Sequence, residues 1–312
     1  MTRTHNDVVL CSQRLQPAGY GERVADNYVF GYILRSRRLR NAFLVFSFVF
    51  LALGLWAFWI EPAWLTTHSF TVQVPQWWPE HHGLKVAVLT DLHVGSPHNG
   101  IEKLKQVVAR TNYEHPDLVV ILGDLVIQEV VGGHFIEPEP IAEVLKRLKA
   151  PLGVIAVLGN HDWWYDGPRI EKALRGAGIV VLENNAHLVQ YKGKSFWVVG
   201  IADLWTRKPD IEGGLHQVEV NDPVLLITHN PDIFPDIPQR VSLTLAGHTH
   251  GGQVNLPVAG RLVVPSKYGQ RYAMGHIVED GRHLFVGGGV GTSILPVRFR
   301  VPPEVVIITL RN

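Results

Sequence analysis

The chain has 312 residues, 46% hydrophobic and 18% charged, which is enough for one domain of about 230 residues with an N-terminal extension. Its single cysteine, Cys11, excludes an intrachain disulfide and a multi-thiolate metal site. Any bound metal must therefore be held by nitrogen and oxygen ligands, and the sixteen histidines make such a site plausible. The net charge of +1 by itself neither favours nor excludes a nucleic-acid partner.

The first predicted element is an apolar segment of nineteen residues, 42–60, without a charged side chain. As a helix it would be about 28 Å long, close to the thickness of the hydrocarbon core of a bilayer. Four arginines precede it within residues 35–40, and no lysine or arginine follows before Lys85. The positive-inside rule predicts that residues 1–41 are a cytoplasmic extension, that 42–60 are a single transmembrane anchor, and that the rest lies on the periplasmic side of the cell inner membrane.

The residues on either side of this segment bear on whether it is exported by the twin-arginine route and whether it is cleaved. Ser36-Arg37-Arg38 resembles the start of a twin-arginine export signal, but Arg40 stands where that signal has a large apolar residue. No small-x-small cleavage motif follows, so we expect the segment to be retained as an anchor. Residues 61–83, which contain three prolines, are expected to form a linker.

Residues 84–312 are predicted to form an α/β domain. Short apolar runs read as strands, and the first three of them alternate with segments of helical spacing. This alternation indicates a parallel core sheet with right-handed crossovers, and the later strands, with less helix between them, favour a layered sandwich of two sheets. The expected strands are 84–90, 117–123, 153–159, 196–201, 223–229, 242–247, 283–288 and 304–310, and the expected helices are 101–110, 141–148 and 169–175.

Side chains of metal-ligand type follow five of these strands. In open α/β sheets the carboxyl ends of the strands form the edge at which ligands bind. A set of six or seven oxygen and nitrogen ligands without sulfur suits a pair of divalent metal ions, and Mn, Fe and Zn are all compatible with it. Asp124 is the natural bridging ligand. The residues are Asp91 and His93, then Asp124, then Asn160, His161 and Asp162, then His229, and finally His248 and His250.

Taken in this order, the blocks Asp-x-His, Gly-Asp, Gly-Asn-His-Asp, a lone His and Gly-His-x-His resemble the calcineurin-like metallophosphoesterase superfamily over residues 84–310. The resemblance implies a four-layer α-β-β-α sandwich. The run Gly-His-Thr-His-Gly-Gly-Gln, with Pro296-Val297-Arg298 and Pro302-Pro303-Glu304, is similar to a membrane-anchored bacterial branch that includes UDP-2,3-diacylglucosamine pyrophosphatase-type phosphoesterases.

The resemblance also implies roles for matching residues. Asp91, His93 and His250 would hold one metal ion, Asn160, His229 and His248 the other, and Asp124 would bridge them. His161 would be catalytic, as a proton donor or charge stabiliser, with Asp162 behind it. The expected function is that of a membrane-anchored dinuclear-metal phosphoesterase that hydrolyses a phosphodiester or pyrophosphate, lipid-linked ones included, by in-line attack of metal-bound hydroxide.

Substrate contacts are less defined by the sequence. Trp163 and Trp164 are candidates to line a substrate pocket, with core packing as the alternative, and Trp205 is open to the same two interpretations. Arg298 is a candidate contact for a substrate phosphate, with a structural ion pair as the alternative.

Two other functions compete with the main prediction. One is a general phosphodiesterase or phosphomonoesterase that acts on soluble substrates, and the other is a non-catalytic metal-binding interaction module. No nucleic acid is expected as a partner, because the domain has no basic stripe with interleaved aromatic residues. The sequence leaves the native substrate, the native metals and the oligomeric state open.

Overall fold

The computed structural model describes residues 36–74, 76–219 and 221–312, so the predicted cytoplasmic extension lies almost entirely outside the described residues. The chain divides into two compact units, one up to Gly54 and one from Leu55 onward. Helix α2 (Arg37–Leu55) is followed directly by a π-helical turn, η1 (Trp56–Ile60). Together they form the one helix among the described residues that is long and apolar enough to cross a membrane.

The larger unit contains two six-stranded sheets. The first has the strand order β1-β14-β2-β3-β4-β5, in which only the pair of β14 and β2 is antiparallel. Its strands are β1 (Thr66–Gln73), β2 (Lys85–Leu89), β3 (Leu118–Ile121), β4 (Val154–Ala156), β5 (Val180–Val181) and β14 (Glu304–Arg311).

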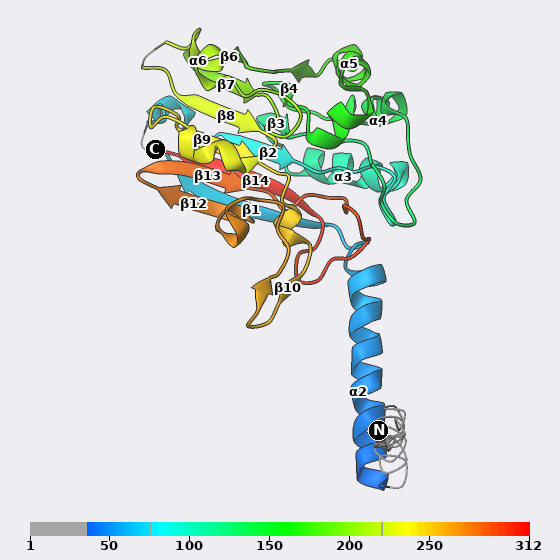
Figure 1. The fold of residues 1–312 in the computed structure, drawn as a ribbon. Helices are drawn as coiled ribbons and strands as arrows, with labels where there is room; N and C mark the ends of the chain where they lie inside the picture. The colour runs from blue at the N-terminus through cyan, green and yellow to red at the C-terminus, as the bar shows by residue number, and fades with distance from the viewer. Residues whose placement is uncertain (1–35, 75, 220) are drawn as a thin grey trace, which may run out of the picture. The chain divides into compact units, whose positions relative to one another are not determined.

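The second sheet has the order β12-β13-β9-β8-β7-β6, with a parallel centre and one antiparallel pair at each edge. A separate short hairpin, β10–β11, projects from the body of this unit (Figure 1). The strands are β6 (Asn185–Tyr191), β7 (Lys194–Ile201), β8 (Val224–Thr228), β9 (Leu243–Ala246), β10 (Asn255–Leu256), β11 (Gly260–Arg261), β12 (Gly275–Glu279) and β13 (Arg282–Val286).

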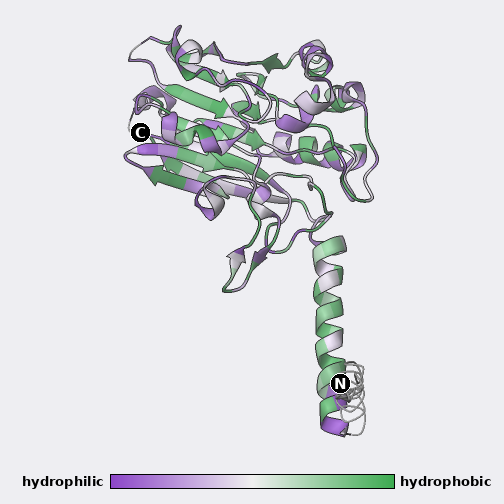
Figure 2. Ribbon diagram, viewed as in Figure 1, coloured by the Kyte–Doolittle hydropathy of each residue, from purple (hydrophilic) through white to green (hydrophobic). Residues whose placement is uncertain are grey.

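The central strands of the first sheet, β14, β2, β3 and β4, are buried on both faces. In β2, Val86 and Val88 pack between the two sheets, whereas Ala87 and Leu89 pack against the helices outside, because successive side chains of a strand point to opposite faces. The apolar colour of the central strands in Figure 2 follows from this burial.

Helices cover the outer faces of both sheets. The first sheet is covered by α3 (Ile101–Tyr113), α4 (Pro138–Leu145) and α5 (Asn160–Gly176). The second is covered by α6 (Ile211–Leu215) and the 3-10 turn η3 (Pro231–Asp236). Further 3-10 turns are η2 (Pro79–His81), η4 (His250–Gly252) and η5 (Gly269–Tyr272). The predicted four-layer α-β-β-α sandwich is confirmed.

Residues 61–83 differ from the expected linker, because they contain β1. This strand pairs with β14 along its whole length, from Thr66 opposite Glu304 to Gln73 opposite Arg311. Its sequence, TTHSFTVQ, alternates poorly and is largely half-buried, as is usual for an edge strand with one partner. Helix α5 also begins nine residues before the expected position, directly after the turn that follows β4.

Candidate metal centre

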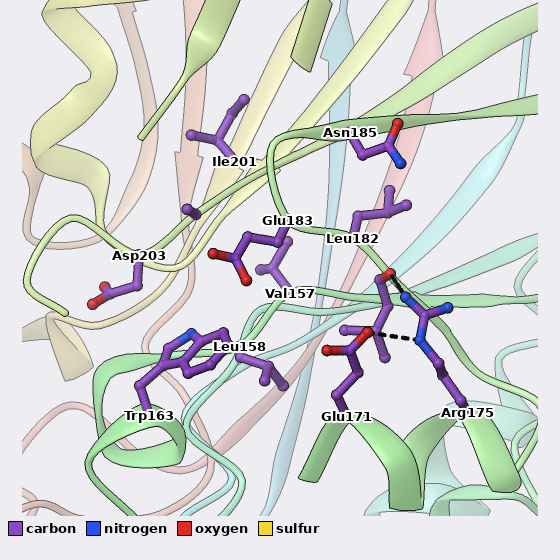
Figure 3. Close-up of a pocket in the computed structure, with 12 residues that line it drawn as sticks. Val157, Leu158, Trp163, Glu171, Arg175, Leu182, Glu183, Asn185, Ile201 and Asp203 are labelled. Carbon is purple, nitrogen blue, oxygen red and sulfur yellow. Dashed lines mark hydrogen bonds and ion pairs between the residues drawn. The ribbon is translucent and has the colours of Figure 1, made fainter. Parts of the chain in front are cut away.

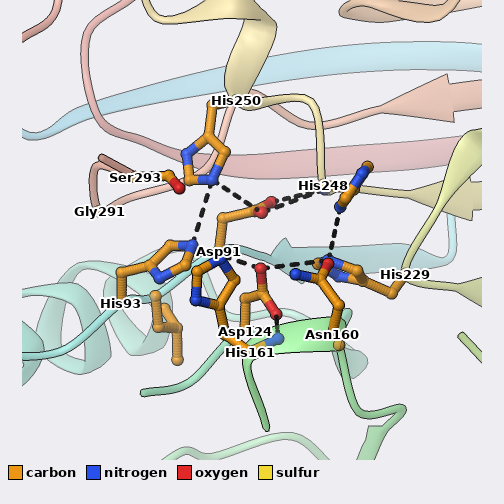
Figure 4. Close-up of polar contacts among 12 residues, drawn as sticks. Asp91, His93, Asp124, Asn160, His161, His229, His248, His250, Gly291 and Ser293 are labelled. Carbon is orange, nitrogen blue, oxygen red and sulfur yellow. Dashed lines mark hydrogen bonds and ion pairs between the residues drawn. The ribbon is translucent and has the colours of Figure 1, made fainter. Parts of the chain in front are cut away.

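All seven predicted metal ligands meet at one edge of the sandwich (Figure 4). The first sheet supplies four of them, after β2, after β3 and at the start of α5, and the second sheet supplies three, after β8 and after β9. None of the seven is more than 4% exposed. The two sheets therefore build one buried polar site between them, from Asp91, His93, Asp124, Asn160, His229, His248 and His250.

The carboxylate of Asp124 joins two groups of side chains. Its Oδ2 atom lies 3.4 Å from His93 Nε2 and 3.2 Å from His229 Nε2. One group that could hold a metal ion comprises Asp91, His93, Asp124 and His250, and the other comprises Asp124, His229 and His248. Asp124 is thus the one member that both groups share.

Within each group, atoms that carry lone pairs approach one another closely. His93 Nε2 lies 3.2 Å from His250 Nε2, which in turn lies 3.3 Å from Asp91 Oδ1. His229 Nε2 lies 3.2 Å from both His248 Nδ1 and Asn160 Oδ1. Two ligand atoms that each bind a common metal ion at about 2.0–2.2 Å come to such separations. The donor sets therefore fit one cation in each group.

The ring of His229 is oriented by a backbone contact. Its Nδ1 atom lies 2.6 Å from the carbonyl oxygen of Leu122, so the Nδ1–H donates there and Nε2 points into the cluster. Metal-binding histidines are commonly fixed by a bond of this kind at the other ring nitrogen. The orientation of the His229 ring is therefore also suited to binding a metal ion.

The backbone of this edge is unusual. Five of the seven residues have a left-handed conformation, which non-glycine residues adopt at a cost of about 1–3 kcal/mol each when the surroundings impose it. Gly247 lies between β9 and His248, and a Cβ atom there would come within 1.8 Å of Thr90 Oγ1. The left-handed residues are Asp91 (φ 48°), His93 (φ 37°), Asp124 (φ 55°), His248 (φ 70°) and His250 (φ 51°).

The protonation of the cluster follows from burial and charge. Burial raises the pKa of Asp124, but His229 and His93 outweigh burial and hold it well below its usual range. Burial lowers the pKa of His229, yet its contacts with Asp124 raise it to about 10. Burial, together with the charge of His229, lowers the pKa of His248 to about 3. The site thus contains the ionised carboxylate of Asp124 beside a protonated His229, and the neutral imidazole of His248 with one free lone pair.

His161 lies beside the cluster rather than within it. Its ring centre is 4.7 Å from that of His93, and its backbone N–H donates to Asp124 Oδ1 at 2.9 Å. The Nδ1 atom of His161 is buried and has no hydrogen-bond partner among the described residues. Burial lowers the pKa of His161 to about 4, so its imidazole is neutral at pH 7.

Asp162 holds the loops of the site together. Its carboxylate accepts hydrogen bonds from the backbone N–H groups of Asp124, Leu125 and Gly159 at 2.8–3.0 Å. Burial raises the pKa of this carboxyl to about 7, although the N–H groups favour its ionised form. Asp162 therefore fixes the position of Asp124 relative to the start of α5.

Two exposed tryptophans flank the cluster. Trp164 contacts His161 edge-on, with ring centres 4.9 Å apart, and is 53% exposed. Trp205 contacts His248 at 4.2 Å, is 51% exposed, and lies 6.3 Å from Trp164. Half-exposed indoles beside the candidate metal ligands face solvent at the site rather than the core.

Trp163 points elsewhere. Its ring lies 4.3 Å from the guanidinium of Arg207 and lines a cavity of about 170 Å³ with Glu171, Arg175 and Asp203, shown in Figure 3. None of the seven predicted metal ligands lines this cavity. The neighbouring tryptophans 163 and 164 therefore have different surroundings, and only Trp164 touches His161.

Arg298 is completely buried, and the structure does not support its predicted contact with a substrate phosphate. Its guanidinium donates hydrogen bonds to the carbonyl oxygens of Gly288, Gly291 and Val301, and burial lowers its pKa to about 10. No ion pair includes it among the described residues, so the predicted alternative does not hold either. Arg298 fixes the loop that leads into β14.

Asp203 is a contributor to the site that the sequence did not single out. It follows β7 at the same edge, and its Oδ2 atom accepts hydrogen bonds from the backbone N–H groups of Trp205 and Thr206. This turn places Trp205 against His248. The signal was available, because a carboxylate directly after a strand is the same pattern that identified Asp91 and Asp124.

Residues 84–252 match the family model described as calcineurin-like phosphoesterase, which is more than half of the chain. The chain belongs to the calcineurin-like phosphoesterase family. It is 31% identical over 82% of its length to the uncharacterized metallophosphoesterase YkuE of Bacillus subtilis, of which 89% is covered. It is 32% identical over 72% of its length to the phosphodiesterase YaeI of Escherichia coli, of which 82% is covered.

A third relative is named a transmembrane protein with metallophosphoesterase domain, from Danio rerio; it is 30% identical over 74% of this chain, and 54% of its own length is covered. Family membership and the cluster of acidic residues and histidines together make this protein a metal-dependent phosphoesterase, a hydrolase that acts on a phosphate-containing substrate.

Proposed function

We propose that the protein is a membrane-anchored dinuclear-metal phosphoesterase with Asp124 as the bridging ligand. The observation that carries this proposal is the position of Asp124 Oδ2, 3.4 Å from His93 Nε2 on one side and 3.2 Å from His229 Nε2 on the other. One metal ion would be bound by Asp91, His93 and His250, and the other by Asn160, His229 and His248. Mn, Fe and Zn all suit these ligands.

Metal ions bound there would lower the pKa of a water molecule and neutralise the oxygens of the phosphate. The protein supplies the geometry. Asp162 and the left-handed turns hold the ligand atoms in place before substrate arrives, which avoids reorganisation during the reaction. His161, neutral at pH 7 and next to His93, would donate a hydrogen bond from its ring N–H to the departing oxygen and stabilise the charge that develops there.

The substrate proposed is a phosphodiester or a pyrophosphate, lipid-linked ones included. The pair Trp164 and Trp205 supports this choice, because two half-exposed indoles beside the metal ligands offer an apolar surface for an acyl chain or a base. Trp163, in contrast, is proposed to support α5 and the cavity behind it.

The proposed location is the cell inner membrane, with residues 1–41 in the cytoplasm and residues 42–60 as a single span. The charge-free segment, the arginines before it and the exposed helix support this topology. The catalytic domain would then lie on the periplasmic side, within reach of lipid-linked substrates. A soluble diester or monoester is the competing substrate class.

The test is an assay of the full chain in detergent after metal reconstitution. UDP-2,3-diacylglucosamine and bis-p-nitrophenyl phosphate are compared as substrates, with His161→Ala as the control. Turnover of the lipid nucleotide that disappears in the variant supports the lipid-linked class. Turnover of the small diester alone discards the lipid-linked class, and two wild-type preparations without any metal-dependent turnover would contradict the proposed mechanism.

A further inference from the structure

Six exposed apolar side chains lie on three segments that backbone hydrogen bonds connect to one another and to the last turn of the apolar segment. They belong to the β10–β11 hairpin and its exit, to the loop before β14, and to the loop after Asp124. Leu262, Val263 and Ile294 are 69%, 76% and 70% exposed. We call this group the apolar rim: Val131, Val258, Leu262, Val263, Ile294 and Leu295.

Backbone hydrogen bonds connect the rim to the last turn of the apolar segment. The N–H of Arg298 donates to the carbonyl oxygen of Ala57 at 2.9 Å, within the unit that begins at Leu55. The neighbouring Phe299 accepts from Asn255, the first residue of the hairpin, at 2.9 Å. The N–H of Val131 donates to Ile294 at 2.9 Å. The rim is therefore built on the same loop that holds Ala57.

The buried carboxylate of Glu61 connects the end of the apolar segment to the loop before β14. Its Oε1 atom accepts from the N–H of Val301 at 2.6 Å, and its Oε2 atom accepts from the indole N–H of Trp56 at 2.6 Å. The side chain of His98 also contacts the carbonyl oxygen of Phe58 at 3.1 Å. Residues 56–61 are thus a docked part of the catalytic unit.

Two left-handed turns of the rim carry residues that are unusual in a turn exposed to water. Val258 and Ile294 have left-handed backbones, with φ of 69° and 62°, although β-branched residues are the least suited to that conformation. A turn exposed to water normally carries glycine, asparagine or aspartate at such a position. Here the tips are apolar instead, as at surfaces that bind a partner or a membrane.

The hairpin and the loop before β14 carry only basic charged residues, whereas the loop after Asp124 carries Glu129 near Val131. No aspartate or glutamate occurs in residues 237–278 or 281–303. Arg261, Lys267 and Arg300 lie in these segments and have no ion-pair partner among the described residues. Apolar tips flanked by unpaired basic side chains fit the interface of a bilayer with anionic headgroups.

We propose that the apolar rim inserts into the surface of the membrane and is a second contact beside the anchoring helix. The proposal rests on the membrane anchor of the proposed function, because that anchor brings the bilayer to residue 60. Two contacts would hold the catalytic unit in one orientation, whereas a helix alone leaves it free to rotate.

The test uses the full chain with Cys11→Ser and one new cysteine, Leu262→Cys or Leu295→Cys, labelled with an environment-sensitive fluorophore. Val278→Cys is the matched control, because Val278 is an exposed apolar residue on the edge strand β12, outside the rim. The proteins are reconstituted into phosphatidylcholine–phosphatidylglycerol vesicles with and without brominated acyl chains. Brominated lipid should quench the two rim labels about twofold and leave the control unchanged, since quenching needs contact with the acyl region.

The outcomes separate the rim from the anchor. Release of the chain by an alkaline wash would overturn the membrane anchor and the rim proposal together. A chain that stays in the vesicles with unquenched rim labels would overturn the rim proposal alone. Blue-shifted but unquenched rim labels, together with cross-linking between copies of the chain, would assign the surface to a second copy and overturn contact with lipid.

Discussion

The metal-binding edge and the apolar rim both hold non-glycine residues in left-handed conformations, but with opposite surroundings. At the edge the strained residues are polar and buried, and their side chains converge on common partners. At the rim they are β-branched and apolar, and their side chains point away from the protein. The same backbone geometry thus positions ligands inward in one region and apolar groups outward in the other.

The two regions differ in burial, and only at the metal-binding edge do contacts within the protein hold the left-handed residues. Residues such as Asp91 are held by hydrogen bonds to the next loop, for example from the N–H of His248 at 3.0 Å. The side chain of Val258 is fully exposed and that of Leu262 is 69% exposed, so packing within the fold does not hold them.

The largest effect is expected for Asp124→Ala at the metal-binding edge. Loss of the shared carboxylate removes a ligand from both groups, so kcat/KM should fall by about 10⁴-fold or more. Activity on bis-p-nitrophenyl phosphate and bound metal by mass spectrometry provide the measurement. Glu143→Ala, an exposed carboxylate on α4, is the control, and wild-type activity with full metal content in Asp124→Ala would refute the bridging role.

A smaller loss is expected for His161→Ala. Since this residue stands beside the ligands, kcat should fall by about 10²–10⁴-fold while the bound metal is retained. Turnover at saturating substrate and metal content are measured on the same preparation. If metal were lost together with activity, His161 would be a ligand, and the division between ligands and His161 would need revision.

Arg298→Met tests the loop that links edge and rim. The substitution leaves the buried carbonyl oxygens of Gly288, Gly291 and Val301 without these donors, and we expect the free energy of unfolding to fall by about 3 kcal/mol. Urea denaturation of the detergent-solubilised chain gives this value. Arg300→Met, which replaces the exposed neighbour, should change it little, and equal effects for both would argue against a structural role of Arg298.

The smallest effect concerns the edge strand β1. His68 Nδ1 lies 2.6 Å from Glu304 Oε2, and this hydrogen bond raises the pKa of His68. A raised pKa means that the pair stabilises the fold fully below pH 6.5 and loses that contribution as the pH rises through the folded-state pKa. The melting temperature of His68→Gln should therefore lie slightly below that of the wild type at pH 6 and equal it at high pH. A difference that is independent of pH would contradict this account.

The metal-binding edge was predictable because its signals are local. Each ligand follows an apolar run that becomes a buried strand, and the ends of those strands must meet once the sheet forms. The strand-end pattern thus predicted one site that includes Asp91 and His229, and the resemblance to the family divided its ligands between two metal ions.

The rim, β1 and Arg298 were not predictable in the same way. Strand β1 has polar residues on both faces because it lies at an edge, so the alternation that marks a strand is absent. Arg298 lies in a loop without periodicity, and its burial depends on carbonyl groups that only the folded loop brings together. An exposed Leu262 looks like any apolar residue until the tertiary structure leaves it uncovered.

The position of β14 has a consequence for biosynthesis. Residues 304–311 lie between β1 and β2, so two strands that leave the ribosome early are joined only by one that leaves it late. Until then the first sheet has an open gap, and long-range pairing of this kind is slow. The domain should therefore mature only after residues 304–311 have been synthesised, which makes the nascent chain a client for chaperones until then.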